Sequence, residues 1–552
     1  MVSDRKPSLS RAFGAALWQL AGLVRASERR RSFRAKAFRT AVWALDDLSR
    51  DLDESDDQLQ TAAGIGPGIV RLVDEFRTTG KLAELEKLAA LYPADAGRMS
   101  RLPRITPGRL RALKALGVDE TQDLLAAVES RAVESIEGIG PATAEKWQRV
   151  LALPPTPGVI PAHDAFVVAS LLSSHLRRHL VGDEVAIAGS VRRMDEWVAV
   201  LDIVVVTDDP ERASHLLEVT AVATSTESQF PSGATLLLHD GLRANVHLSK
   251  RSAAGSVLVE ATGPPAHLEE LVSALTHDHA TEEDVYRATG RVWVPAPARV
   301  RPSPPADVVT ENALRGDLHL HSDWSPDGHM AMEAILSAAV ERGYDYVAIT
   351  DHTIGLRFGG LDSAALRRQR SMIDDLRAGF PDLVVLHAAE INIDRHGRPD
   401  LEENALAELD FVVAGCHSDF DLAPNIQTER IVAALSHPAV RVLAHPTGRR
   451  IGIRPGFDLD IDAVIATAVD FDVALEVNGH RDRLDLSADF AERAGAAGAR
   501  LAANSDAHRF EELANILNAV GVMQRAGVRP GAVVNTMSPD RFLTWLRPDN
   551  QC

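Results

Sequence analysis

Cysteine and long apolar runs are both scarce in this sequence of 552 residues. The two cysteines, Cys416 and Cys552, are too few for a disulfide framework, so we expect a reducing, cytoplasmic location. No apolar run approaches the roughly 18 residues of a membrane helix, and the N-terminus shows no signal-peptide pattern. We therefore expect no association with a membrane, and nothing in the sequence indicates an obligate protein partner.

The chain also lacks an excess of positive charge. It carries 78 acidic and 59 basic residues, for a formal net charge of −19. This balance excludes wholesale electrostatic attraction to a polyanion, so any contact with nucleic acid must be local. The length exceeds that of one ordinary core and predicts three or four domains.

What the sequence does contain is a short apolar strand followed by metal-ligand side chains, Asp317–Gly328. Side chains two apart in a strand share a face, so His319 and His321 can hold one ion. Asp327 follows after a turn that its neighbouring proline and glycine would shape. Such a pair alone is as often an inconsequential surface feature as it is a site.

Repetition of the pattern favours a site. Five further apolar runs end in a carboxylate or an imidazole: Tyr346–His352, Leu383–Glu390, Phe411–His417, Val440–Pro446 and Leu501–His508. Parallel strands gather their ends at one rim of a barrel or sheet. Strand patterns near residues 317, 346, 384, 411, 441, 473 and 501, with helical patterns between them, predict a parallel barrel of seven strands.

These motifs resemble the PHP (polymerase and histidinol phosphatase) domain. The resemblance implies a distorted (β/α)7 barrel that binds up to three divalent metal ions. The implied ligands are His319, His321, Asp327, His352, Glu390, His417, His445, Asp506 and His508. The stretches Thr350–His352, His445–Arg449 and Arg483–Leu486 are more similar to the PHP domain of bacterial family X DNA polymerases than to free-standing histidinol phosphatases.

The mixture of imidazole and carboxylate ligands suits Mn²⁺, Zn²⁺ or Fe²⁺. Glu390 is the candidate bridge between ions, because a carboxylate can bridge two cations and an imidazole cannot. The guanidinium forks of Arg449 and Arg454 could clamp phosphate oxygens. An ion pair with a nearby aspartate is the alternative for one of these arginines. The catalytic candidates are Glu390, Asp506, Arg449 and Arg454.

The N-terminal region reads as helical and contains two Gly-x-Gly turns, each before a helical pattern. Unpaired amides at such a turn can seat one phosphate without reading base sequence. The turns resemble helix-hairpin-helix DNA-binding motifs, and the DNA-binding candidates are Gly64, Gly66, Gly68, Gly138 and Gly140. Between them, Pro103–Gly108 resembles a degenerate copy without the first glycines. The basic run Arg25–Arg39 predicts either a phosphate-contacting segment or a solvated helix face.

The following mixed segment resembles the nucleotidyltransferase-like palm of family X polymerases. Ser190, Arg192, Arg193 and Asp202 correspond to its nucleotide-binding and metal-binding positions. Val200 stands where the first carboxylate of the Asp-x-Asp pair is expected, and Asn245 stands near the third. An amide is a poorer magnesium ligand than a carboxylate. We therefore expect a vestigial nucleotide site, and Leu72 in place of the family's lyase lysine makes lyase activity doubtful.

The predicted division is a multidomain chain. The expected parts are a helical lyase-like domain with a helix-hairpin-helix (1–90), a fingers-like domain (91–155), a degenerate palm and thumb (156–293), a proline-rich linker (294–310) and a PHP domain (311–552). The linker is expected to be extended and polyproline-like, separating two independently folding bodies.

The resemblance implies a metal-dependent phosphoesterase that acts on DNA 3′ ends in repair, as a 3′–5′ exonuclease or 3′-phosphatase. The expected partner is gapped, nicked or 3′-ended DNA. Three alternatives stay open: an active family X DNA polymerase, a phosphatase of the histidinol phosphate type, and a non-catalytic scaffold at DNA ends.

Overall fold

The computed structural model describes residues 9–28, 32–45, 52, 59, 63–154, 158–230, 232–356 and 359–547. Part of the basic run (29–31), residues 155–157 and Cys552 lie outside the described residues. The chain divides into two units, Met1–Trp293 with Gly452–Arg454 and Val294–Ile451 with Pro455–Cys552.

The first unit begins with helices, as predicted. They are α1 (Leu9–Ser27), α2 (Phe33–Ala44), α3 (Pro67–Thr79), α4 (Ala83–Ala89), α5 (Ala96–Met99), α6 (Pro107–Ala115), α7 (Thr121–Glu129) and α8 (Pro141–Leu151). Proline opens α3, α6 and α8, where its missing amide hydrogen costs no helical bond. Phe13, Leu17 and Phe38 lie in one apolar core of these helices, and Leu110, Leu113 and Trp147 lie in another.

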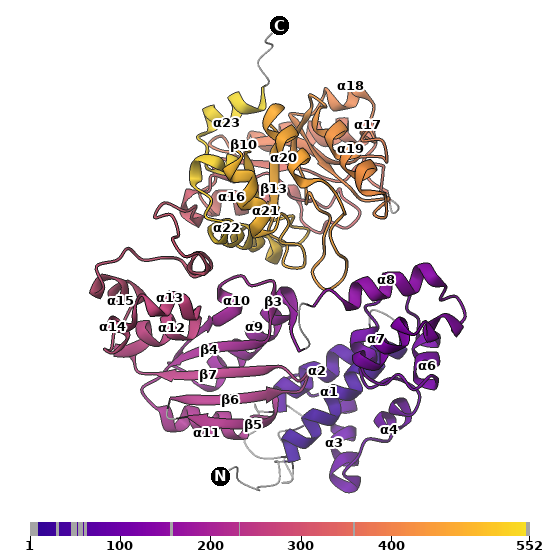
Figure 1. Cartoon of the computed structure of the whole chain (residues 1–552), viewed down its shortest axis with the longest axis vertical. Coiled ribbons are helices and arrows are strands. Elements are labelled where there is room, and N and C mark those ends of the chain that lie inside the picture. Colours follow the sequence, from indigo (N-terminus) through magenta and orange to yellow (C-terminus); the bar gives the residue numbers. More distant parts are fainter. Residues whose placement is uncertain are drawn as a thin grey trace. The chain divides into compact units, whose positions relative to one another are not determined.

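A mixed sheet follows in the order β2-β4-β7-β6-β5. Its strands are β2 (Glu184–Ala188), β4 (Val200–Val206), β5 (Ala223–Phe230), β6 (Gly233–Leu238) and β7 (Arg243–Ser249). Helices α9 (Ala162–His179) and α11 (Pro210–Val219) pack on one core of the sheet, and α12 (Ala254–Thr262) packs on another (Figure 1). The central strands β4 and β7 are parallel, and their register sets Asp202 directly beside Asn245.

The second unit is a parallel barrel with the seven predicted strands. They are β8 (Gly316–Asp317), β9 (Tyr346–Ile349), β10 (Val384–Asn392), β11 (Phe411–Gly415), β12 (Val440–Leu443), β13 (Ala474–Asn478) and β14 (Leu501–Asn504), paired in chain order. A parallel bridge between Leu320 and Ala507 joins the two ends of this sheet. The prediction of a parallel barrel of seven strands is therefore confirmed.

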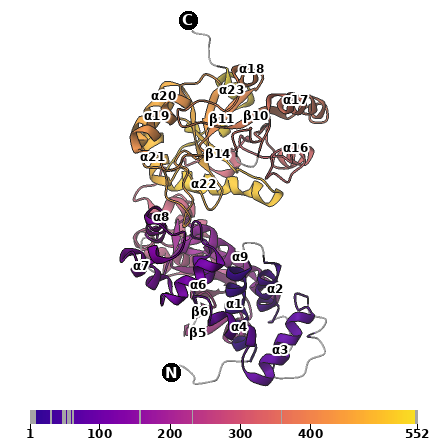
Figure 2. The ribbon, with the colours of Figure 1, turned by 90° about the vertical axis from the view of Figure 1, so that its right-hand side faces the viewer.

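Helices surround the barrel strands. They are α16 (Met332–Glu341), α17 (Ser363–Arg377), α18 (Glu403–Leu406), α19 (Pro424–Leu435), α20 (Ile461–Asp470), α21 (Ala488–Ala496), α22 (Ile516–Arg525) and α23 (Pro539–Leu546). Figure 2 shows α19, α20 and α21 on one side of β10, β11 and β14, and α16 and α17 on the other. The strands are consequently buried on both faces, which explains their nearly continuous apolar sequences.

The proline-rich segment after Trp293 is not the extended spacer that its composition predicts. Residues Ala296–Val300 form a 3₁₀ helix, η5, that packs against α22 of the second unit. Ala296 and Ala298 are buried, and the Nε atom of Arg299 donates to the carbonyl oxygen of Val294 at 3.0 Å. The small apolar side chains between the prolines allow this close packing, so the segment is part of the barrel unit.

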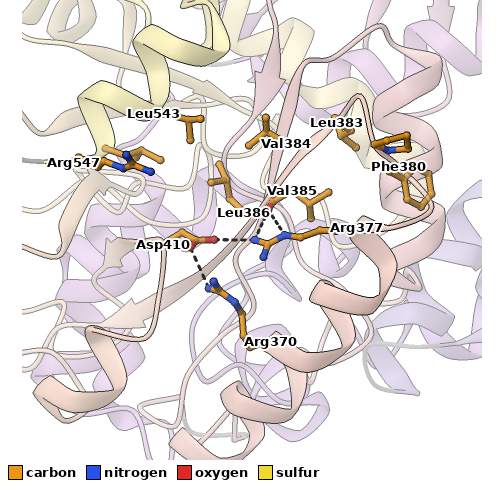
Figure 3. A pocket seen from close by; sticks show the side chains of 12 residues that line it. Arg370, Arg377, Phe380, Leu383, Val384, Val385, Leu386, Asp410, Leu543 and Arg547 are labelled. Carbon is orange, nitrogen blue, oxygen red and sulfur yellow. Dashed lines mark hydrogen bonds and ion pairs between the residues drawn. The ribbon is translucent and has the colours of Figure 1, made fainter.

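A cavity of about 480 Å³ lies beside the amino-terminal end of β10, at the opposite end of that strand from Glu390 (Figure 3). Among the described residues that line this cavity, Asp410 is the only carboxylate. Its oxygens lie 3.1 Å from Nη1 of Arg370 and 3.2 Å from Nη2 of Arg377, and one of them accepts the amide of His387 at 2.8 Å. One carboxylate thus ties α17 to the start of β10.

We expect Asp410→Asn to destabilise the barrel, because it removes the charge that pairs two partly buried guanidinium groups. The loss should be about 1–3 kcal/mol and should appear as a lower Tm in thermal unfolding. Asp375→Asn on α17 is the matched control, because Asp375 is exposed and should change stability by less than about 0.5 kcal/mol. Equal Tm values for the two variants would contradict this role of Asp410.

Candidate metal centre

The ends of the parallel strands carry nearly all of the predicted ligands. His319 and His321 follow β8, His352 follows β9, and Glu390 lies within β10. The remaining strand-end ligands are His417 after β11, His445 after β12, and Asp506 and His508 after β14. Because parallel strands end at the same rim, the topology brings these side chains together.

Asp327 reaches the same rim from the loop after β8. Gly328 makes this loop possible, because a Cβ atom at residue 328 would lie 1.8 Å from the carbonyl oxygen of Ser322. The Oδ2 atom of Asp327 lies 3.5 Å from Nε2 of His508 and 3.8 Å from Nε2 of His352.

The carboxylate of Glu390 is the centre of the cluster and is 1% exposed. Its Oε2 atom lies 3.0 Å from Nδ1 of His352, 3.2 Å from Nε2 of His319 and 3.5 Å from Nε2 of His321. Its Oε1 atom lies 2.9 Å from Nε2 of His445 and 3.1 Å from Nε2 of His417. The two oxygens therefore face different imidazoles, which is the arrangement a bridging carboxylate needs.

Asp506 completes the set. Its Oδ1 atom lies 3.3 Å from Nε2 of His321 and 3.6 Å from Nε2 of His319. The structure thus brings all nine predicted ligands into one cluster. Three groups have ligand atoms within 4.8 Å of one another: His319 with His321 and Asp506, His352 with Glu390 and His417, and His321 with His352 and His508.

The chemistry of the cluster fits divalent cations. Buried Nδ1 of His352, both ring nitrogens of His417 and Oδ1 of Asp327 make no hydrogen bond within the described part of the chain. Buried polar atoms without hydrogen bonds are rare in native proteins, and imidazole nitrogens and carboxylate oxygens are ligands for Zn²⁺, Mn²⁺ and Fe²⁺. The donor set does not distinguish among these metals.

Glu476 in β13 supports the ligands and was not anticipated from the sequence. Its Oε1 atom lies 2.7 Å from Nδ1 of His319, and its Oε2 atom accepts the amide of His445 at 2.6 Å. A carboxylate on the far nitrogen orients an imidazole ligand and fixes its tautomer. The detectable signal was an acidic residue inside the apolar run Val473–Val477.

Arg483 is the arginine that lies beside the ligands, with Nε at 3.3 Å from Oδ2 of Asp506. Arg449, a predicted phosphate clamp, donates instead to carbonyl oxygens of the loop that carries Arg483, from Nε to Arg483 at 3.0 Å and from Nη2 to Leu484. Arg450 pairs with Asp482, at 2.8 Å from Nε. Arg454 lies in the segment that groups with the first unit, and its predicted role stays a prediction.

Burial and neighbouring charges shift the pKa values of the ligands in different directions. Burial lowers the pKa of His508, but its hydrogen bond to Asp327 and the charge of Asp506 outweigh burial and raise this pKa to about 9. Burial opposes the ionisation of Asp327, yet His508 and His352 lower its pKa to about 2. Burial and the charge of Arg483 lower the pKa of His445 to about 4. The ligands therefore include both proton-loaded and proton-free imidazoles.

The predicted nucleotide-binding residues of the mixed sheet contact one another and their neighbours. Both Nη atoms of Arg192 bind the carboxylate of Glu282 at 2.7 Å. Arg193 binds Asp195 at 2.6 Å and Ser190 Oγ at 3.1 Å.

The one carboxylate at the expected palm position, Asp202, is also engaged. Its Oδ1 atom accepts the side-chain amide of Asn245 at 3.0 Å and lies 3.4 Å from Nε2 of His247. Side chains of the neighbouring strand β7 therefore contact the Asp202 carboxylate.

The two predicted DNA-binding turns have the same local geometry. Gly64 and Gly138 adopt positive φ values of 91° and 76°, and Gly66 and Gly140 are the N-caps of α3 and α8 without a side-chain cap. The degenerate middle copy differs, because the Oγ1 atom of Thr106 accepts the amide of Arg109 and caps α6. Gly68 lies in the first turn of α3.

The barrel and its cluster define a PHP-type metal-binding domain, and the model of the PHP domain matches residues 317–437. The chain is 30% identical over 541 residues to the DNA polymerase/3′-5′ exonuclease PolX of Bacillus subtilis (strain 168), covering 92% of this chain and 94% of that protein. The chain therefore belongs to the PolX family of bacterial family X DNA polymerases with a C-terminal PHP domain.

Shorter relatives share part of the chain. A probable phosphatase of Syntrophotalea carbinolica is 28% identical over 231 residues, 40% of this chain and 90% of that protein. A probable phosphatase of Edwardsiella ictaluri is 30% identical over 245 residues, 42% of this chain and 93% of that protein. Among the described residues, no helix has the length and apolarity needed to cross a bilayer.

Metal binding at the group of His321, His352 and His508 should release a proton near neutral pH. Since the pKa of His508 is about 9, this imidazole is protonated at pH 7 and must lose its proton to become a ligand. The affinity for Mn²⁺ should therefore rise with pH up to about 9. Calorimetric titration in buffers of different ionisation enthalpy measures the released protons, and His508→Gln should release about one fewer. The same count for both proteins would exclude this coupling.

Proposed function

We propose that this protein is a metal-dependent phosphoesterase that acts on DNA 3′ ends in repair, as a 3′–5′ exonuclease or 3′-phosphatase. The observation that carries the proposal is the buried Glu390 carboxylate, which five imidazoles surround. The name of the Bacillus subtilis relative includes a 3′-5′ exonuclease, which agrees with this chemistry. The two-cysteine composition supports a cytoplasmic location.

The residues at the barrel rim would have three different roles: metal binding, orientation of the ligands and stabilisation of phosphoryl charge. The nine ligands would hold up to three divalent ions, which supply Lewis acidity and an activated water when bound. Glu390 presents its two oxygens to separate ligand groups, and Glu476 keeps the His319 ring in place. The guanidinium group of Arg483, which lies beside Asp506 and is 21% exposed, would stabilise charge on a phosphoryl group, and Arg449 would hold the loop of Arg483.

The proposed DNA contacts lie in the first unit. The uncapped starts of α3 and α8, at Gly64–Gly68 and Gly138–Gly140, can each seat a backbone phosphate of gapped, nicked or 3′-ended DNA. The proposed domains are a helical lyase-like domain (1–90), a fingers-like domain (91–155), a palm and thumb (156–293) and a PHP domain (311–552).

We also propose that the palm no longer polymerises DNA. Templated phosphoryl transfer with two magnesium ions needs several carboxylates, and here Val200 and Asn245 flank a single Asp202 that is already hydrogen-bonded. Arg192 is likewise occupied by Glu282. An active polymerase is the second candidate function. It is favoured by the name of the Bacillus subtilis relative, because the similarity to this chain extends over 94% of that protein.

Two further candidates fit fewer observations. A phosphatase of the histidinol phosphate type agrees with the shorter relatives, but the helical turns of the first unit would then have no role. A non-catalytic DNA-end scaffold would leave the nine-residue cluster without a role.

The double variant His319→Ala/His321→Ala should lose hydrolysis of 3′-end-labelled DNA in Mn²⁺ by at least about 100-fold, because two ligands of the buried cluster are removed. Gel analysis of the labelled products measures this loss, and mass spectrometry under native conditions measures the bound metal. His277→Ala/His396→Ala, which removes two exposed histidines, should keep full activity. Equal hydrolysis by all three proteins would assign the activity to another site.

Primer extension separates the phosphoesterase from the polymerase. With a gapped template, deoxynucleotides and Mg²⁺ or Mn²⁺, the His319→Ala/His321→Ala variant should show no extension, because the palm retains one carboxylate at the expected positions. Use of this variant prevents degradation from hiding synthesis. Robust templated extension would overturn the proposed loss of polymerase chemistry.

A further inference from the structure

One guanidinium group joins the two hairpin turns of the fingers-like region. Arg109 lies in the first turn of α6, next to the degenerate motif Pro103–Gly108. Its Nη2 atom donates to the carbonyl oxygen of Gly138 at 2.9 Å, and its Nε atom donates to that of Glu137 at 3.3 Å. Its Nη1 atom donates to the carbonyl oxygen of Arg104. All three acceptors belong to turns, so Arg109 connects the degenerate turn to the turn that precedes α8.

A second connection runs in the opposite direction. The buried Trp147 of α8 donates from Nε1 to the carbonyl oxygen of Pro103 at 2.8 Å. Leu110 and Leu113 of α6 share an apolar core with Ala144 and Trp147 of α8. The two helix–turn segments are therefore fixed to each other by a hydrogen bond from each side and by a common core.

The glycine at residue 138 matches this arrangement. A Cβ atom at this position would lie 2.1 Å from Nη2 of Arg109, and the φ value of 76° already disfavours other residues. At the equivalent Gly64 the nearest atoms are instead side-chain carbons of Thr40 and Ala44, at 3.2 and 3.3 Å. Only the second turn makes room for a guanidinium group.

The start of the degenerate motif also differs from the start of α8. In α6 the amide of Arg109 is bonded to the side-chain Oγ1 of Thr106, whereas in α8 the equivalent amide of Thr143 is bonded to the backbone carbonyl oxygen of Gly140 at 2.9 Å. The start of α6 therefore carries a side-chain cap, and the start of α8 does not. The middle copy thus contacts the Gly138–Gly140 turn through the Arg109 side chain, which stabilises that turn.

Electrostatics favour the same reading. The carbonyl oxygens of Glu137 and Gly138 carry partial negative charge close to the start of α8, and they would repel an approaching phosphate. The guanidinium group binds both oxygens and adds a positive charge beside them. Since the carbonyl and the following amide of a peptide point in opposite directions, holding these oxygens also fixes the adjoining amides.

We propose that Arg109 is a positioning residue that holds the Gly138–Gly140 turn in the geometry that binds a DNA phosphate. The proposal rests on the proposed function, in which this turn contacts DNA. The degenerate motif then contributes to DNA affinity through one side chain rather than through its own backbone.

The test is DNA binding by the full chain, measured as fluorescence anisotropy of a gapped duplex in EDTA so that no hydrolysis is required. Arg109→Ala should weaken binding about tenfold or more, and Arg109→Lys should weaken it nearly as much, because lysine keeps the charge but loses the planar fork. The matched control is Arg111→Ala on the same helix. Arg111 is exposed and should change affinity by no more than about threefold, with a salt-dependence slope altered by one unit at most.

Further readouts separate positioning from loss of fold and from loss of charge. In Mn²⁺, Arg109→Ala should raise KM for DNA while kcat stays unchanged. Exchange of the Ile139 amide, which donates to the carbonyl oxygen of Ile136 at 3.0 Å, should become faster. Gly138→Ala, which fills the space of the guanidinium group, should reproduce the defect. Full rescue by Arg109→Lys, or equal affinities for Arg109→Ala and Arg111→Ala, would overturn the proposal. Wild-type protein that fails to bind DNA would overturn the proposed DNA contact itself, and this inference with it.

Discussion

The second unit depends on the burial of one carboxylate. Removing Glu390 from water is costly unless charges or donors compensate it, and five imidazole rings from the ends of β8, β9, β11 and β12 do so. The charges of His417, His319 and His352 lower the pKa of Glu390 well below its usual value despite burial. Seven parallel strands are the means by which residues so distant in sequence can reach one side chain.

The barrel interior is accordingly layered. Below the rim, Leu318, Ala348, Ala388 and Val413 form an apolar core that closes the centre. At the rim the interior is polar and hydrogen-bonded, with Asn504 and Asn478 donating to Glu476 at 2.9 and 3.0 Å. Burial of apolar side chains in the lower layer stabilises the barrel and offsets the cost of removing the charged groups of the upper layer from water.

Sequence patterns predicted the seven strands, because each strand is an apolar run that is local in sequence. The nine clustered side chains were implied by the resemblance to the PHP domain. Sequence patterns did not predict Glu476, Arg483 or Arg109, whose partners are distant in sequence and depend on strand register and helix packing. Composition also misrepresented the proline-rich segment at Ala296–Val300, because burial against α22 overrides the preference of isolated prolines for an extended chain. The periodicity of apolar residues predicts which face of a strand or helix is buried. It does not predict which side-chain atoms contact one another on that face.

The hydrogen bond from Asn245 to Asp202 has a consequence for the charge balance of the mixed sheet. An aspartate at residue 245 alone would set two like charges side by side with a valine at residue 200, and each would oppose ionisation of the other. A neutral amide turns that repulsion into attraction. The Asn245 side chain therefore lets β4 and β7 pair at this point without a cation to neutralise a second carboxylate.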